Sequence, residues 1–162
     1  MEPYDLALGS YRLRLYIDNG FIVSSVFEKA YPQYVDCFSE HREVVEKAKA
    51  FLESYQKGYH AYGLIKPFLL EPHTDFQGRL RLFLWQTEYG TTLSYAMVAK
   101  ALYSSPQGVG QALRANPYAL FVPCHRIVGK KDLGGYQGDT DTEIKAFLLA
   151  YEKNKKNAPS LS

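Results

Sequence analysis

The most reactive combination of neighbouring side chains in this sequence is Cys124 with His125 and Arg126, directly after Pro123. A cysteine is nucleophilic only as the thiolate, and a neighbouring imidazole or cationic group favours that form. These residues could therefore carry nucleophilic chemistry at sulfur. Free cysteines are also often plain core residues, so adjacency alone leaves both interpretations open.

The elements around the cysteine must position it. The apolar run from Ala119 to Val122 predicts a buried strand, which has to end at Pro123 because proline cannot continue a hydrogen-bonded ladder. Upstream we expect a helix over residues 93–103 and a second, short helix over 106–115, with Ser105 as N-cap and Pro106 as the first helical residue. Two short helices joined so closely are typical of a helix-turn-helix, and equally of an ordinary helical hairpin in a core.

The N-terminal part predicts a hairpin and one helix. Residues 11–17 and 21–28 alternate apolar and polar around Asn19-Gly20, a pair that favours a tight primed turn. From residue 40 to 57 apolar side chains recur at helical spacing, and Gly58 ends the pattern. Residues 59–77 contain glycine and proline and are interpreted as a linker.

At the other end of the chain, residues 140–143 form a capping box before a helix whose apolar side chains recur at i, i+3, i+4 and i+7. We therefore expect an α/β protein in two parts. Residues 1–70 would form a small N-terminal α/β domain, a hairpin plus a helix with the linker. Residues 71–162 would form a mainly helical C-terminal domain with the helix-turn-helix and the cysteine.

The composition and the charge distribution limit the classes of protein to which this chain can belong. The 162 residues are 46% hydrophobic and 15% aromatic, which excludes a disordered chain. Residues 1–78 hold 8 Lys/Arg and 11 Asp/Glu, a net −3, whereas residues 79–162 hold 11 and 6, a net +5. A basic half is compatible with a polyanionic partner but does not demand one.

Targeting and metal signals are absent from the sequence. No apolar run approaches the ~20 residues of a membrane span, and the N-terminus lacks the regions of a signal peptide. Cys37 and Cys124 form no Cys-x-x-Cys pair, and His41, His60 and His73 lack ligand spacing, so neither a disulfide nor a zinc site is indicated. We expect a cytoplasmic protein with no metal and no cofactor.

A longer string gives the cysteine a context. NPYALFVPCHRIV at residues 116–128 closely resembles the active-site signature of the O6-alkylguanine-DNA alkyltransferases, the methylated-DNA–protein-cysteine methyltransferases. The similarity begins at YGTTLSY (89–95), runs through the two short helices and extends to GGYQG (134–138) and LLAYE (148–152). About the C-terminal half of the chain is covered.

The resemblance implies a set of catalytic residues. Cys124 would accept the alkyl group, and His125, oriented by Glu152, would act as its base through a water. Asn116 corresponds to the hinge asparagine of the family, although it could equally be a helix C-cap. Tyr95 matches the tyrosine that assists base rotation and gives the leaving guanine a proton.

Further residues would bind the substrate and DNA. Tyr136 would line the alkyl pocket, while the carbonyls of Cys124 and Ile127 and the amide of Gln137 would read the guanine edge. The second short helix would enter the minor groove with little sequence preference. We assign to DNA binding Ser94, Gln107, Gly108, Gly110, Gln111, Arg114 and Arg126.

One position departs from the family. The arginine that many members insert into the vacated base stack would fall on Gln107, which lacks the charge and the stacking plane of a guanidinium. We therefore expect weaker or slower base flipping in this protein.

The implied activity is single-turnover DNA repair: irreversible transfer of a methyl or larger alkyl group from O6-alkylguanine, and possibly O4-alkylthymine, to Cys124 of a monomer. Three alternative functions explain these residues less well. A non-enzymatic lesion binder of the same superfamily would lack the reactive cysteine, whereas a helix-turn-helix regulator or a cysteine hydrolase would leave Asn116, Tyr95 and Glu152 unexplained.

Overall fold

The computed structural model describes residues 1–130, 132–137 and 142–156. The chain forms two compact units, the first made of Met1–Glu71 with Pro117–Phe121 and the second of Pro72–Asn116 with the segment from Val122 onward. The fold is that of an α/β protein with a small sheet-containing N-terminal part and a helical C-terminal part.

The first unit is built on an antiparallel sheet of three strands in the order β1-β2-β3: β1 (Glu2–Leu8), β2 (Tyr11–Asp18) and β3 (Phe21–Glu28). The predicted hairpin is confirmed, because Asn19 (φ 50) and Gly20 (φ 78) both take the positive angles of a primed turn. Strand β1 was not predicted. Its buried Asp5 interrupts the apolar alternation and is bonded by Arg14 of β2.

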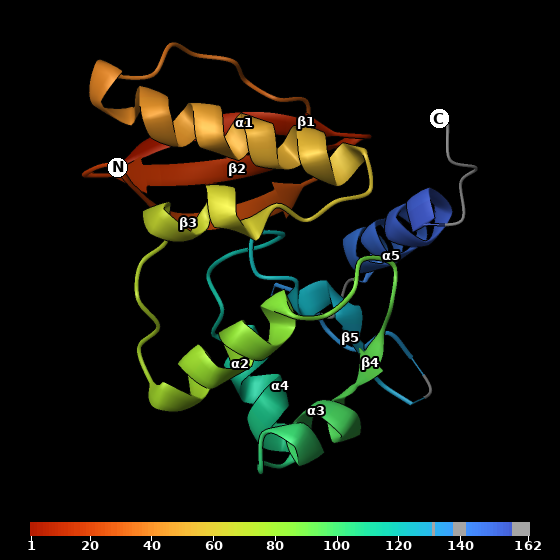
Figure 1. Cartoon of the computed structure of the whole chain (residues 1–162). Coiled ribbons are helices and arrows are strands. Elements are labelled where there is room, and N and C mark those ends of the chain that lie inside the picture. Colours follow the sequence, from red (N-terminus) through yellow and green to blue (C-terminus); the bar gives the residue numbers. More distant parts are fainter. Residues whose placement is uncertain (131, 138–141, 157–162) are drawn as a thin grey trace. The chain divides into compact units, whose positions relative to one another are not determined.

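The predicted helix of this unit is also confirmed. After η1 (Ser39–His41), α1 (Arg42–Gln56) lies across one face of the sheet (Figure 1), and Gly58 follows with φ 97. The residues that α1 buries are Val44, Val45, Ala48, Phe51, Leu52 and Tyr55.

The interpretation of residues 59–77 as a linker is wrong. This stretch contains η2 (Tyr62–Leu64) and η3 (Lys66–Phe68), and it buries Tyr62, Ile65 and Leu69. It also includes the start of α2 (Asp75–Trp85), which is capped by the Thr74 hydroxyl accepting a bond from the Gln77 amide at 3.1 Å. Gly78 inside α2 weakens the helical pattern, which is why the sequence did not reveal it.

The second unit brings α2 together with α3 (Tyr95–Ala101), α4 (Pro106–Arg114) and α5 (Glu143–Lys156). The expected helix over 93–103 is shorter, because Leu93–Ser94 form β4, which pairs in parallel with β5 (Ile127–Val128). Helix α4 agrees with the prediction, and its N-cap Ser105 accepts a bond from the Gly108 amide at 3.0 Å.

The expected buried strand over Ala119–Val122 is a turn instead. All four residues are buried, but Leu120 has φ 71 and the Phe121 amide bonds the Ala119 carbonyl two residues back. The preceding residue Tyr118 forms a bridge with Ser25 of β3, and the Ala119 amide donates to the Ser25 carbonyl at 3.1 Å. Hydrophobicity therefore predicted the burial correctly, and the backbone conformation incorrectly.

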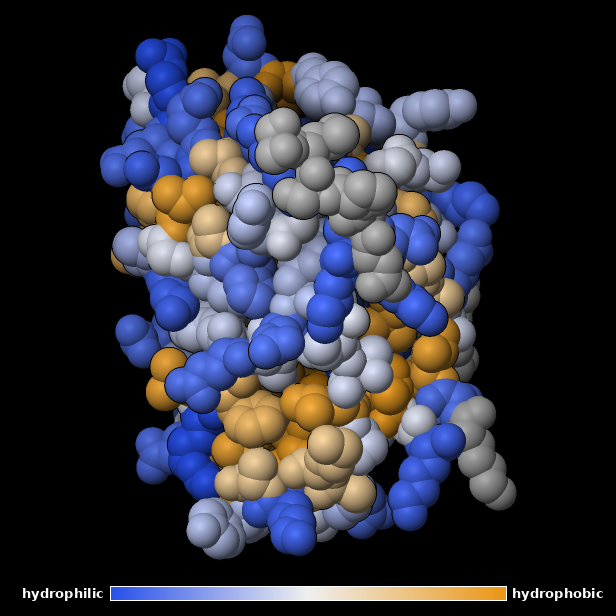
Figure 2. Space-filling view, turned by 45° about the vertical axis from the view of Figure 1, so that its right-hand side comes forward, coloured by the Kyte–Doolittle hydropathy of each residue, from blue (hydrophilic) through white to orange (hydrophobic). Residues whose placement is uncertain are grey.

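Helix α5 is confirmed from Glu143 to Lys156, whereas Thr140 and Asp141 of the predicted capping box, and Gly138, lie outside the described residues. No helix in the described part of the chain is long and apolar enough to cross a membrane. Apolar residues lie among charged ones on the face drawn in Figure 2. The exposed large apolar side chains of the second unit include Leu82 and Met97.

Candidate active site

A cavity of about 600 Å³ opens in the second unit beside Cys124. This volume lies within the ~300–1,000 Å³ of small-molecule sites. Residues from α3, α4, η4 and the segment before α5 surround it. They are Tyr95, Pro106, Gln107, Gly110, Leu113, Arg114, Cys124, Gly135, Tyr136 and Gln137.

Cys124 is the first residue of η4 (Cys124–Arg126) and not the end of a strand. Its Sγ accepts a hydrogen bond from Asn116 Nδ2 at 3.5 Å. Burial raises the pKa of the Cys124 thiol, while the Asn116 amide and the charge of Lys145 lower it. Asn116 therefore lies at the nucleophile, one residue beyond Ala115, which is the actual C-cap of α4.

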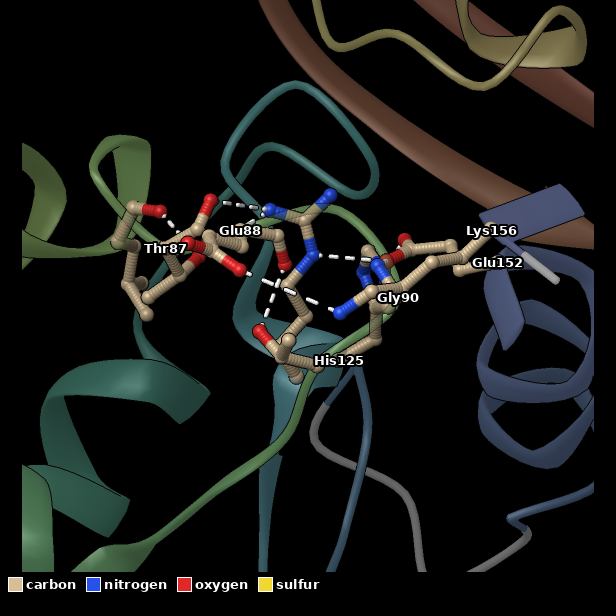
Figure 3. Close-up of polar contacts among 9 residues, drawn as sticks. Thr87, Glu88, Gly90, His125, Glu152 and Lys156 are labelled. Atoms are coloured by element: carbon tan, nitrogen blue, oxygen red, sulfur yellow. Dashed lines mark hydrogen bonds and ion pairs between the residues drawn. The ribbon is translucent and has the colours of Figure 1, made fainter.

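Directly after the cysteine, His125 is fully buried and pairs through Nε2 with Oε2 of Glu152 on α5. The second oxygen of Glu152 accepts bonds from Arg126 Nε at 2.8 Å and from the Gly90 amide at 3.0 Å, a cluster drawn in Figure 3. Burial raises the pKa of Glu152, but the pairing with His125 and Arg126 lowers it by more than burial raises it. Glu152 is therefore a carboxylate. Burial in turn lowers the pKa of His125.

The structure corrects our assignment of Arg126 to DNA binding. Its side chain is 0% exposed, and besides Glu152 it binds the Thr87 carbonyl and Oγ1, both at 3.1 Å. A guanidinium enclosed in this way is not available to a phosphate.

Sequence analysis missed Lys145, which is 1% exposed and lies close to the nucleophile. Its Nζ donates to the Ile127 carbonyl at 2.6 Å and to the Gly135 carbonyl at 3.1 Å. Burial lowers the pKa of Lys145 to about 8, although the charges of Cys124 and Asp132 raise it. The available signal was spacing, because Lys145, Leu148 and Glu152 share one face of α5.

Tyr95 lines the cavity together with Cys124. Burial raises the pKa of its hydroxyl, and the charges of Cys124 and Asp132 raise it too, so the hydroxyl keeps its proton. The ring lies against the backbone at Gly134 (φ 72), where a Cβ would overlap the hydroxyl and come within 2.9 Å of Cε2. Glycine is therefore required there by close approach as well as by its backbone angle.

Of the three other residues expected to contact the guanine, two line the cavity and one does not. Tyr136 is 4% exposed, lines the cavity and meets the His125 ring edge-on at 6.3 Å between centroids. Gln137 also lines the cavity, with φ 54. Ile127 is fully buried and is not among the lining residues, and its carbonyl already accepts the Lys145 bond.

Helix α4 has the two faces that its sequence indicates. Val109 and Ala112 are buried, whereas Gln107, Gln111 and Arg114 are exposed. Of this exposed face, Gln107, Gly110 and Arg114 also line the cavity.

The two small residues of α4 and the expected contact at Ser94 have different local roles. A Cβ at Gly108 would lie 2.7 Å from Ser104 Oγ, so the turn itself requires this glycine, while Gly110 has open space in front of it. Ser94 caps α3 by accepting a bond from the Met97 amide at 3.1 Å.

This arrangement can receive a group at sulfur. A cavity bordered by an exposed helix face holds a cysteine, a proton-bearing tyrosine hydroxyl and, behind the cysteine, a histidine paired with a carboxylate. Among the described residues no group of three or more His, Cys, Asp or Glu could hold a metal ion. The fold and the site are those expected of a domain that accepts a group on a cysteine sulfur.

Comparison with known proteins identifies its family. Residues 75–154 match the model of the 6-O-methylguanine DNA methyltransferase DNA-binding domain. The chain is 32% identical to the methylated-DNA–protein-cysteine methyltransferase of Archaeoglobus fulgidus, over 82% of this chain and 84% of that protein. It is 40% identical to the constitutive enzyme of Bacillus subtilis, over 71% of each.

A solved structure is also similar. The crystal structure of Mycobacterium tuberculosis OGT in complex with DNA superposes with a TM-score of 0.70 at 25% identity, covering 94% of this chain and 93% of that one. The chain belongs to the methylated-DNA–protein-cysteine methyltransferase family.

Proposed function

We propose that this protein repairs DNA by taking the alkyl group of O6-alkylguanine, methyl above all, onto Cys124 in a single irreversible turnover. The observation that carries the proposal is the position of Cys124. It opens into a cavity of about 600 Å³ bordered by the exposed face of α4, and the His125–Glu152 pair lies behind it. Family membership supports the same chemistry.

The reaction balances with the groups present. His125 takes the thiol proton through a water, the sulfur attacks the alkyl carbon, and a C–S bond forms as the C–O6 bond breaks. The departing guanine takes a proton from the Tyr95 hydroxyl. Because Glu152 only accepts hydrogen bonds, Nε2 of His125 must carry a hydrogen, which leaves Nδ1 as the basic nitrogen. Nδ1 is buried without a hydrogen-bond partner among the described residues.

The thioether that results is a poor leaving group, and nothing in the proposed chemistry returns the sulfur to a thiol. Each molecule therefore acts once. The proposal requires no cofactor, and two free cysteines fit a protein that works in the reducing cytoplasm. O4-alkylthymine is a second possible substrate on the same chemistry.

DNA would be bound through α3 and α4 acting as a helix-turn-helix, with α4 in the minor groove and the damaged base turned out into the cavity. The exposed face of α4 supports this, because its Gln and Arg side chains reach both solvent and the cavity rim. Minor-groove readout is degenerate, so we expect little sequence preference. We propose that the protein binds as a monomer. The proposed domain boundary at residue 70/71 agrees with the two compact units except at Glu71 and Pro117–Phe121, which belong to the first unit.

Mass spectrometry tests the proposal. After incubation with a duplex carrying O6-methylguanine, we expect the intact chain to gain one methyl group, located on the Cys124 peptide, with one methyl transferred per molecule. An unmodified Cys124 peptide would reject the proposal. Repeated turnover with release of product would instead indicate a hydrolase.

The Cys124→Ala variant separates chemistry from binding. We expect it to transfer no methyl group yet to bind the duplex as tightly as the parent, because the proposed DNA contacts lie on other residues. Binding that depends strongly on one base sequence would favour a transcriptional regulator.

A further inference from the structure

Arg126 has no role in the proposed DNA interface, although it belongs to the motif that singled out Cys124. Its guanidinium is fully buried. It donates from Nε to Glu152 and from Nη1 to the Thr87 carbonyl and hydroxyl, and its charge lies over the Tyr89 ring at 5.8 Å. A buried cation needs compensation of this kind. The arrangement therefore fixes the guanidinium against one specific carboxylate.

The charges of this cluster cancel when His125 is neutral. Glu152 is 1% exposed and carries one negative charge, and Arg126 carries one positive charge. The titratable and charged groups that face His125 are Cys124 and Arg126 on η4, Tyr136 before α5, and Lys145 and Glu152 on α5. The Arg126 guanidinium is bonded to the same carboxylate as His125.

Without Arg126, the buried Glu152 carboxylate would lose a cation that is bonded directly to it. A buried ion left unpaired is unfavourable, so the imidazole would take up a second proton and become the missing cation. An imidazolium has no lone pair at Nδ1 and accepts no proton from a thiol. Consistently, burial lowers the pKa of His125, Glu152 raises it, and Arg126 lowers it again.

We infer that Arg126 is a positioning residue whose guanidinium balances the Glu152 carboxylate, so that Glu152 can orient His125 while the imidazole stays neutral and free to take the Cys124 proton. This inference rests on the proposed alkyl transfer. The thiol proton moves through a water to Nδ1, the electron pair stays on sulfur, and Arg126 neither gains nor loses a proton.

Titration of the His125 ring by NMR tests the inference in the full chain, with its signals assigned by their loss in His125→Gln. We expect Arg126→Met to raise the pKa of His125 by about one unit or more, because a neighbouring cation is removed. Arg126→Lys should leave it near the parent value, since the charge remains. Thr87→Val, which loosens the same guanidinium without changing charge, should not move it either.

The pH profile of alkyl transfer gives the second measurement. With a pKa raised by one unit, His125 in Arg126→Met is protonated up to a higher pH, so transfer should fall about fivefold at the old midpoint and recover toward the parent rate as pH rises. A rate reduced by the same factor at every pH, or an unchanged His125 titration, would overturn the inference.

If Arg126→Met does not fold, as judged by circular dichroism, Arg126→Gln decides, because it removes the charge and keeps a polar side chain beside Glu152 and Thr87. Arg126→Gln must then raise the pKa of His125 above the parent value, and an unchanged value overturns the inference. Because the titration needs no DNA, it gives its answer even if the parent protein transfers no methyl group.

Discussion

The residues around Cys124 act on its pKa in opposite directions. Burial opposes the thiolate, while the Asn116 amide, 3.5 Å from Sγ, and the nearby Lys145 charge favour it. The site therefore buries the sulfur away from water and still stabilises the negative charge of the thiolate. A dry site strengthens every charge interaction within it, so the loss of one such group has a large effect.

Lys145 offers a test at this scale. Its pKa of about 8 means that it is charged at neutral pH, and we expect Lys145→Met to raise the pKa of Cys124 by about one unit or more. The pH dependence of iodoacetamide labelling measures this, in a Cys37→Ser background so that only Cys124 reacts.

The control for this prediction is Lys145→Arg, which keeps the charge. We expect its labelling profile to stay close to that of the parent. If Lys145→Met labels with an unchanged profile, the contribution of Lys145 to the thiolate is refuted, and its bonds to the Ile127 and Gly135 carbonyls are its only function.

Among the elements, α4 connects the cavity with the surface. The helix begins cleanly because Ser105 caps it and Pro106 occupies its first position. Its buried face packs through Val109 and Ala112, and this leaves Gln107 at the start of the helix exposed at the cavity rim. A side chain there is in position to replace a base that has left the stack.

Gln107→Arg tests that position. A guanidinium can stack on neighbouring bases and carries a charge, which Gln107 does not. We expect methyl transfer from duplex DNA to become faster by about fivefold, the equivalent of about 1 kcal/mol of stacking, with little change for the free modified base. Rates measured on both substrates decide the outcome.

Gln111→Arg is the matched control on the same helix. Gln111 is exposed but does not line the cavity, so the variant adds the same charge without reaching the vacated stack. We expect only a salt-dependent gain in DNA affinity. Equal acceleration by both variants would mean that charge, and not position, explains the effect of Gln107→Arg.

At the scale of the whole molecule, the path of the chain links the two units. Residues Pro117–Phe121 belong to the first unit, and the chain enters the second at Val122, two residues before Cys124. Tyr118 anchors the segment: its hydroxyl donates to the Ile22 carbonyl at 2.6 Å and accepts from the Leu70 amide at 2.8 Å. Folding of the first unit thus holds the segment that leads to the nucleophile.

Tyr118→Phe should therefore destabilise the protein. Removing a buried hydroxyl leaves a carbonyl and an amide without this partner, and we expect the free energy of unfolding to fall by about 1–3 kcal/mol. Urea denaturation measures the change. Tyr31→Phe is the control, since Tyr31 is 93% exposed and its substitution should have no effect. Equal stability of both variants would contradict the anchoring role.

The sequence by itself determined the features that depend on neighbours along the chain. Asn19-Gly20 specified a primed turn, Ser105-Pro106 the start of α4, and helical periodicity the helices α1 and α5, because turns, caps and amphipathic faces follow from local backbone preferences. The motif around Cys124 likewise identified the family, because its residues are contiguous in sequence.

Only the tertiary structure decided which groups meet the nucleophile and in what state. The sequence assigned Arg126 to DNA binding, whereas the structure surrounds it with Glu152 and Thr87. The sequence did not single out Lys145, whose buried ammonium group binds the Ile127 carbonyl. The turn at Leu120 likewise depends on pairing with a distant strand. Burial and charge compensation are set by residues far apart in the chain, so local pattern does not contain them.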